Sequence, residues 1–325
     1  MANPFRSSRR STDPRRGGRN AEANPTEPRA PLPPRGIYAV MGATGGVGAT
    51  SAACALALDI AAEIARDRPA FASLSAGESR VCLIDLDFEC GACAHHLDLL
   101  PTLSTEDLRR PPSQFDSAVL AAMVDQSVAG VTLLGAVNGD PGHPDPRTVL
   151  ALLDAASQLF DHVVLDVPRH IQPWTAAALA GADVAMVMCE LTVPSLHMAR
   201  LRRAQLGTVL QQAGQTLHPV IGKLERRAGR GALSLTDAET ALGVAPFATL
   251  PLDPEALRVV VNSGEPLTAA RPDCRYLRGV TALRGRYQAL MAQDYEDAPD
   301  ARDVAETGAS TESQPCRSTA SQAAA

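Results

Sequence analysis

A short glycine-rich segment, "ATGGVGAT" at residues 43–50, carries residue types that could bind a phosphate group. The usual pattern for such a loop is G-x-x-x-x-G-K-[ST], in which backbone N–H groups surround the anion and the lysine reaches its oxygens. Here Gly48 and Thr50 keep their places, whereas Ala43 replaces the first glycine and Ala49 replaces the lysine. The sequence therefore predicts a cradle of main-chain amides without its customary positive side chain. The residues expected to bind the anion are Gly45, Gly46, Val47, Gly48, Ala49, Thr50 and Ser51.

Three aspartates follow apolar runs elsewhere in the chain. Asp85 and Asp87 lie at the end of the run in "VCLIDLDFECG", and Asp166 ends the run in "FDHVVLDVPR". Carboxylates at the carboxyl ends of parallel strands converge on the crevice where ligands bind. The simpler interpretation, that these aspartates cap neighbouring helices, also stays open.

The elements that must position these residues are short apolar runs alternating with helical patterns, the order typical of βαβ units. The runs lack strict alternation, as expected of strands buried on both faces. The sequence predicts an α/β fold, a three-layer parallel sheet with helices on both faces. Strands are expected at 37–41, 81–85, 131–134, 162–166, 184–189, 219–224 and 248–250, and helices at 50–65, 117–125, 147–159, 173–180, 195–212, 235–242, 254–261 and 276–291.

Length and charge suit one sizeable domain between two charged tails. The chain has 325 residues, of which 45% are hydrophobic and 20% charged, with a formal net charge of -6. Residues 1–36 hold eight arginines and three acids, whereas 294–325 hold seven acids and two arginines. We expect a disordered Arg/Pro-rich leader at 1–35, a folded domain at 36–293 and a disordered acidic tail at 294–325.

Composition also disfavours several classes of protein. An aromatic content of 3% offers few stacking platforms, which argues against binding of single-stranded nucleic acid. The sequence contains neither a signal peptide nor an uninterrupted apolar segment of membrane-spanning length, so a cytoplasmic location is expected. Seven cysteines, an odd number scattered through apolar segments, indicate reduced thiols and no disulfide framework.

Five segments together resemble the CpaE/TadZ proteins of Flp (tad) pilus assembly, a branch of the MinD/ParA class of P-loop ATPases. The resemblance covers about residues 36–293. It implies the P-loop NTPase fold with a deviant Walker A loop, ATP and Mg²⁺ as cofactors, and a homodimer. It also implies a scaffold at a cell pole or in peripheral contact with the inner membrane, with a secretion ATPase and an inner-membrane platform as partners. The segments are "GATGGVGATSAACALAL", "LIDLDFECGACAHHLDLLPTLSTEDL", "FDHVVLDVPR", "GADVAMVMCELTVPSLHMAR" and "LPLDPEALRVVVNSGEPL".

The same resemblance assigns roles to the polar residues. Thr50, Asp85 and Asp166 match the Mg²⁺ shell of the class, and Asp87 matches the residue that positions the attacking water. In the class, dimer contacts lie around the nucleotide crevice. The face that carries Thr44, Asp87 and Arg169 is therefore the candidate dimer interface.

Three side chains that handle nucleotide in this class are missing. The two lysines of the class correspond to Thr44 and Ala49, and the adenine-recognising asparagine corresponds to Gly222-Lys223. Hydrogen bonds to charged groups contribute about 1.5–3 kcal/mol each, so two lost lysines weaken binding roughly 10²–10⁴-fold. The resemblance thus implies weak ATP binding and weak or absent hydrolysis, with Asp87 catalytic only in an active enzyme.

Two local alternatives remain. Cys90 and Cys93 form a C-x-x-C pair beside His95 and His96, a pattern found in redox and zinc sites. The resembling family carries small or polar residues at the cysteine positions, which favours a packing role. Lys223, the only lysine of the chain, is either a solvated loop residue or a replacement phosphate contact.

The alternative function is an active MinD/ParA-type ATPase in chromosome partition or in septum or machine positioning. It would need an arginine from this chain or from a partner to replace the lysines. A third hypothesis, a DNA-binding partition protein, would use the arginine-rich leader to contact phosphates.

Overall fold

The computed structural model describes residues 35–67, 80–124, 126–137, 144–225, 229 and 231–296. Residues 1–34 of the expected leader and 297–325 of the expected tail lie outside these described residues. Their predicted disorder therefore stays a prediction.

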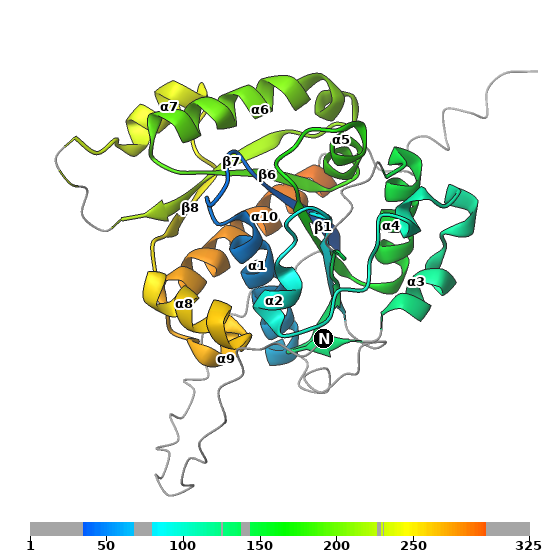
Figure 1. The fold of residues 1–325 in the computed structure, drawn as a ribbon. Helices are drawn as coiled ribbons and strands as arrows, with labels where there is room; N and C mark the ends of the chain where they lie inside the picture. The colour runs from blue at the N-terminus through cyan, green and yellow to red at the C-terminus, as the bar shows by residue number, and fades with distance from the viewer. Residues whose placement is uncertain are drawn as a thin grey trace, which may run out of the picture. The chain divides into compact units, whose positions relative to one another are not determined.

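An eight-stranded sheet forms the middle layer, in the order β3-β4-β2-β5-β1-β6-β7-β8 (Figure 1). All neighbouring strands are parallel except β3, which pairs antiparallel with β4. The seven expected strands are confirmed, with bounds that shift by two residues at most. The strands are β1 (Gly36–Gly42), β2 (Val81–Asp85), β3 (Ser127–Val128), β4 (Val131–Leu134), β5 (His162–Val167), β6 (Val184–Cys189), β7 (Leu217–Leu224) and β8 (Ala248–Pro251).

The edge strand β3 was not predicted. It joins β4 through Ala129 and Gly130, whose φ angles of 50° and 80° match a tight hairpin turn in which both central residues are left-handed. Asparagine or aspartate usually stands at the first of these positions, and alanine gives no such signal.

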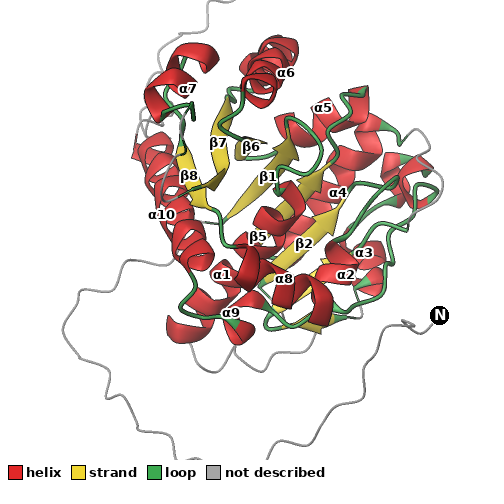
Figure 2. Ribbon diagram, turned by 60° about the vertical axis from the view of Figure 1, so that its left-hand side comes forward, coloured by secondary structure: helices red, strands yellow, loops and turns green. Residues whose placement is uncertain are grey.

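Helices cover both faces of the sheet, as predicted (Figure 2). Apolar side chains of α1, α2, α8, α9 and α10 pack on one face, and those of α3 to α7 pack on the other. The helices are α1 (Ala49–Asp67), α2 (Cys93–Leu97), α3 (Ser117–Met123), α4 (Pro146–Leu159), α5 (Pro173–Ala180), α6 (Val193–Gln212), α7 (Leu235–Leu242), α8 (Pro254–Ser263), α9 (Leu267–Ala270) and α10 (Arg275–Glu296). Within the described residues, no helix is both long and apolar enough to cross a bilayer.

Helix α1 is buried between the sheet and α10, because eleven of its residues, mostly alanine and leucine, are shielded from solvent. Its one buried acid, Asp59, pairs with Arg284 of α10 at 2.7 Å. This packing fixes the amino end of α1, and with it the glycine-rich loop, against the centre of the sheet.

Strand register brings the predicted carboxylates together. Asp85 at the end of β2 is level with Asp166 near the end of β5, and Met41 of β1 is level with Val167. The loop after β1 and the aspartates of β2 and β5 therefore share the carboxyl edge of the sheet, where ligands of such folds bind.

Candidate nucleotide-binding site

The glycine-rich loop connects β1 to α1 in the backbone geometry that glycine allows. Gly46 and Gly48 have φ angles of 76° and 91°, values that side-chain-bearing residues rarely adopt. Ala43, at the first position of the pattern, is buried and donates its N–H to the carbonyl of Met188 at 2.8 Å. The loop thus keeps the shape expected of an anion cradle at the start of a helix.

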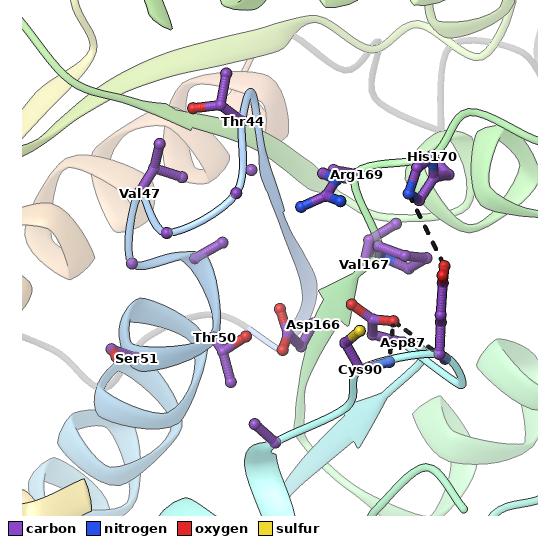
Figure 3. A pocket seen from close by; sticks show the side chains of 18 of the residues that line it. Thr44, Val47, Thr50, Ser51, Asp87, Cys90, Asp166, Val167, Arg169 and His170 are labelled. Carbon is purple, nitrogen blue, oxygen red and sulfur yellow. Dashed lines mark hydrogen bonds and ion pairs between the residues drawn. The ribbon is translucent and has the colours of Figure 1, made fainter. Parts of the chain in front are cut away.

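A cavity of about 400 Å³ lies against this loop (Figure 3). It is lined by all seven residues predicted to bind the anion, and by Asp87 and Asp166. Its other lining residues include Glu89, Cys90, His96, Arg169 and His170, none of which was expected to contact a nucleotide.

Asp166 and Asp85 form the buried, acidic floor beside this cavity. Asp166 accepts a hydrogen bond from the hydroxyl of Thr50 and lies 3.5 Å from the Cys93 thiol. Asp85 does not line the cavity, and it accepts the backbone N–H groups of Asp87 and Cys93, each at 3.0 Å. Burial raises the pKa of Asp85 to about 6, and burial followed by the Asp85 charge raises the pKa of Asp166 well above its usual range.

This donor set suits Mg²⁺. The Thr50 hydroxyl and the Asp166 carboxylate are hard oxygen ligands at the start of α1, and Mg²⁺ is commonly held by one or two carboxylates together with phosphate oxygens. A divalent cation would also relieve the mutual repulsion of two buried carboxylates. Asp85, the third predicted Mg²⁺ ligand, is buried beside Asp166 and does not line the cavity, so its role as a ligand stays a prediction.

Cys93 packs in the core, as expected, and its thiol also lies beside the carboxylates of Asp85 and Asp166. Ligand atoms of Asp85, Cys93 and Asp166 all lie within 4.8 Å of one another. Cys93 is fully buried, and desolvation raises the pKa of its thiol well above the usual value, whereas Cys90 is exposed. A redox pair needs an accessible thiolate of low pKa, so this environment speaks against the redox interpretation.

Asp87 occupies a position suited to contact a ligand. Its Oδ1 atom accepts the backbone N–H groups of Glu89 at 3.2 Å and Cys90 at 2.9 Å, which fixes the carboxylate at the cavity wall. The side chain is half-exposed, so water can reach it.

Two basic residues follow β5 on the cavity wall. Arg169 lies so close to the loop that a Cβ atom added to Gly45 would be 2.6 Å from its Nη1 atom. His170 lies 3.9 Å from the carboxylate of Glu89. The sequence placed Arg169 only on the candidate dimer face, since no spacing rule links it to the loop.

At the end of β7, neither Gly222 nor Lys223 replaces the lost nucleotide contacts. Lys223 has a φ angle of 51° and pairs with Glu190 at 2.7 Å, and it does not line the cavity. Gly222 packs against the loop, because a Cβ atom there would be 3.0 Å from the carbonyl oxygen of Val47. Lys223 is solvent-exposed, as the first interpretation expected, but it lies in strand β7 and not in a loop, and its partner is Glu190.

Comparisons with known proteins give structural matches alone: no family model matches the chain, and no curated protein matches it. A ParA family ATPase from Chlorobium tepidum TLS matches with a TM-score of 0.64 and 15% identity over 77% of this chain and 98% of that one. The cell division ATPase MinD of Pyrococcus furiosus matches with a TM-score of 0.60 and 19% identity over 78% and 98% of the two chains. The septum site-determining protein MinD of Pyrococcus horikoshii OT3, complexed with Mg-ADP, matches with a TM-score of 0.58 and 16% identity over 78% and 96%. These likenesses establish that the chain has the fold of the MinD/ParA P-loop ATPases.

Proposed function

We propose that the chain binds ATP with Mg²⁺ in the cavity beside the glycine-rich loop. The observation that carries this proposal is the meeting of the amide cradle, the Thr50 hydroxyl and the carboxylates of Asp87 and Asp166 around one cavity. A structural neighbour, MinD of P. horikoshii, was solved as a complex with Mg-ADP, which supports the proposal. Bound Mg²⁺ would neutralise charge on the phosphates, with Thr50 and Asp166 at the cavity and Asp85 behind them as its protein shell.

Within this proposal, turnover is slow or absent. Asp87 is placed to orient a water molecule, but Thr44 and Ala49 supply no cation from the loop to a transferring phosphoryl group. A cation at that place is worth on the order of 10³–10⁵ in rate. Bound nucleotide then favours a homodimer, whose interface is the face that carries Thr44, Asp87 and Arg169.

The cellular role we propose is that of a CpaE/TadZ-like pilus assembly protein, a scaffold of the Flp (tad) type IV pilus secretion machinery. It would act in the cytoplasm, at a pole or at the inner membrane surface, with a secretion ATPase and an inner-membrane platform as partners. The five segments that resemble this family support the role, above all "LIDLDFECGACAHHLDLL" and "VVLDVPR". The folded domain of this scaffold would span residues 36–293.

The second candidate is an active MinD/ParA-type ATPase in chromosome partition or in septum or machine positioning. One observation favours it: the guanidinium of Arg169 lies against the loop, where the lysines are missing.

Deletion of the gene in its host, followed by complementation, separates the two functions. The scaffold proposal expects loss of surface pili on deletion, and recovery with both the wild type and Asp87→Ala, because assembly does not need turnover. Normal piliation with misplaced septa or chromosomes, corrected by the wild type alone, would contradict the scaffold and support the ATPase.

A further inference from the structure

Arg169 projects from the segment after β5 toward the glycine-rich loop (Figure 3). Its Nη1 atom lies 2.6 Å from the position that a Gly45 Cβ would take, and Arg169 lines the same cavity as Asp87 and Asp166. The absence of a side chain at Gly45 is therefore what allows a guanidinium to lie against the loop.

The guanidinium of Arg169 has no acidic partner among the described residues. By contrast, Arg35 pairs with Asp161 at 3.0 Å and Arg284 with Asp59 at 2.7 Å. The three acids that share the cavity with Arg169 have other partners: Asp87 accepts backbone amides, Asp166 accepts the Thr50 hydroxyl, and Glu89 lies 3.9 Å from His170. The guanidinium of Arg169 therefore lines the cavity without a direct ion pair to any described acid.

A second arginine strengthens this positive field. Burial and then the charge of Arg169 lower the pKa of Arg202 on α6. The Nε atom of Arg202 is buried and has no hydrogen-bond partner in the described part of the chain. Two guanidinium groups whose charges repel each other favour the arrival of an anion.

We propose that Arg169 supplies, from the end of β5, the phosphate-binding charge that the loop itself has lost. This inference rests on the proposed nucleotide site. The guanidinium contacts the phosphate chain of a nucleoside polyphosphate that the loop amides hold. Arginine suits this task because its planar donors match phosphate oxygens in pairs. Gly45 then has two roles, giving an amide to the cradle and leaving room for the guanidinium.

Calorimetric titration of the full-length protein with Mg-ATP tests this proposal. Arg169→Ala should weaken binding about 10- to 100-fold, and Arg169→Lys should lose less. The matched control is Arg258→Ala on the exposed side of α8, which removes the same charge and should leave affinity unchanged. Thermal unfolding without nucleotide should not change for Arg169→Ala, because its guanidinium pairs with no described acid.

Gly45→Ala provides an independent variant. The added methyl group must displace the Arg169 side chain, a shift that a long flexible side chain makes at little cost to folding. We expect Gly45→Ala to weaken Mg-ATP binding in the wild type and to have little further effect in Arg169→Ala. Additive losses in this double-mutant cycle would contradict a shared mechanism.

Tripolyphosphate serves as a probe of the phosphate chain without the nucleoside. Arg169→Ala should weaken it by a factor similar to that for Mg-ATP, and a loss confined to ATP would overturn the phosphate contact. If the wild type binds Mg-ATP and Arg169→Ala binds within twofold of it, the inference fails while the proposed function stands. No binding of millimolar Mg-ATP by the wild type would overturn both.

Discussion

Removal of the Arg284 guanidinium should destabilise the fold strongly, because it leaves a carboxylate charged and buried. Arg284 Nε lies 2.7 Å from Asp59 Oδ2, and its Nη2 lies 3.0 Å from Glu63 Oε2. The side chains of Arg284 and Asp59 are 8% and 3% exposed, so water cannot replace the lost partner. Breaking such a pair costs about 3–5 kcal/mol, a large part of a typical folding free energy of about 5–15 kcal/mol.

Urea unfolding followed by circular dichroism measures this cost in Arg284→Met. The matched control is Arg66→Ala, which removes a partner of the same Glu63 at 2.7 Å from a side chain that is 63% exposed. Because surface pairs contribute about 0–1 kcal/mol, the control should lose little. Asp59→Asn in the Arg284→Met background should recover part of the loss by removing the orphaned charge. Equal losses in Arg284→Met and Arg66→Ala, or no recovery in the double variant, would refute the reasoning.

The site gives three further predictions. Ala49→Lys, which restores the lost loop cation, should tighten Mg-ATP binding about 10- to 100-fold in calorimetry, and an unchanged Kd would contradict the placement of the phosphates. Thr50→Ala should remove most of the Mg²⁺ dependence of nucleotide binding, measured with and without EDTA; full dependence in the variant would exclude Thr50 as a ligand. The pKa of Asp85 is raised to about 6 in the folded protein, so between about pH 4 and 6 the folded state holds a proton that the unfolded chain has lost. The contribution of Asp85 to the free energy of unfolding therefore falls as the pH rises through this range. The free energy of unfolding of Asp85→Asn, measured with urea relative to the wild type, should therefore rise by about 1–3 kcal/mol between about pH 4.5 and pH 7. A difference between the two proteins that does not change with pH would contradict the raised pKa.

The sheet and the aspartates at its carboxyl edge were predictable because they depend on local patterns. Central parallel strands are buried on both faces and appear as apolar runs, which is why β2 and β4 were found with correct bounds. The convergence of Asp85 and Asp166 follows from strand polarity alone. Short elements such as α2, α9 and β3 were missed, because two to five residues do not show a hydrophobic period.

Contacts between residues far apart in the sequence were not predictable from spacing. Asp59 and Arg284 are 225 residues apart, and only the packing of α1 against α10 brings them together. Arg169 reaches the loop because β5 and β1 are neighbours in the sheet and because Gly45 has no side chain. The first condition depends on sheet topology, which residue spacing does not reveal. The C-x-x-C spacing was visible, but the burial of Cys93 beside Asp166 depends on the turn after β2.

Phosphate release by the wild-type protein, at Mg-ATP concentrations that calorimetry shows to saturate the site, tests the central claim most directly. An amide cradle with intact carboxylates and no loop lysine should bind the nucleotide and release phosphate more slowly than about 10⁻² s⁻¹. Release at about 1 s⁻¹ or faster that Asp87→Ala abolishes would contradict this account and identify the protein as a working ATPase.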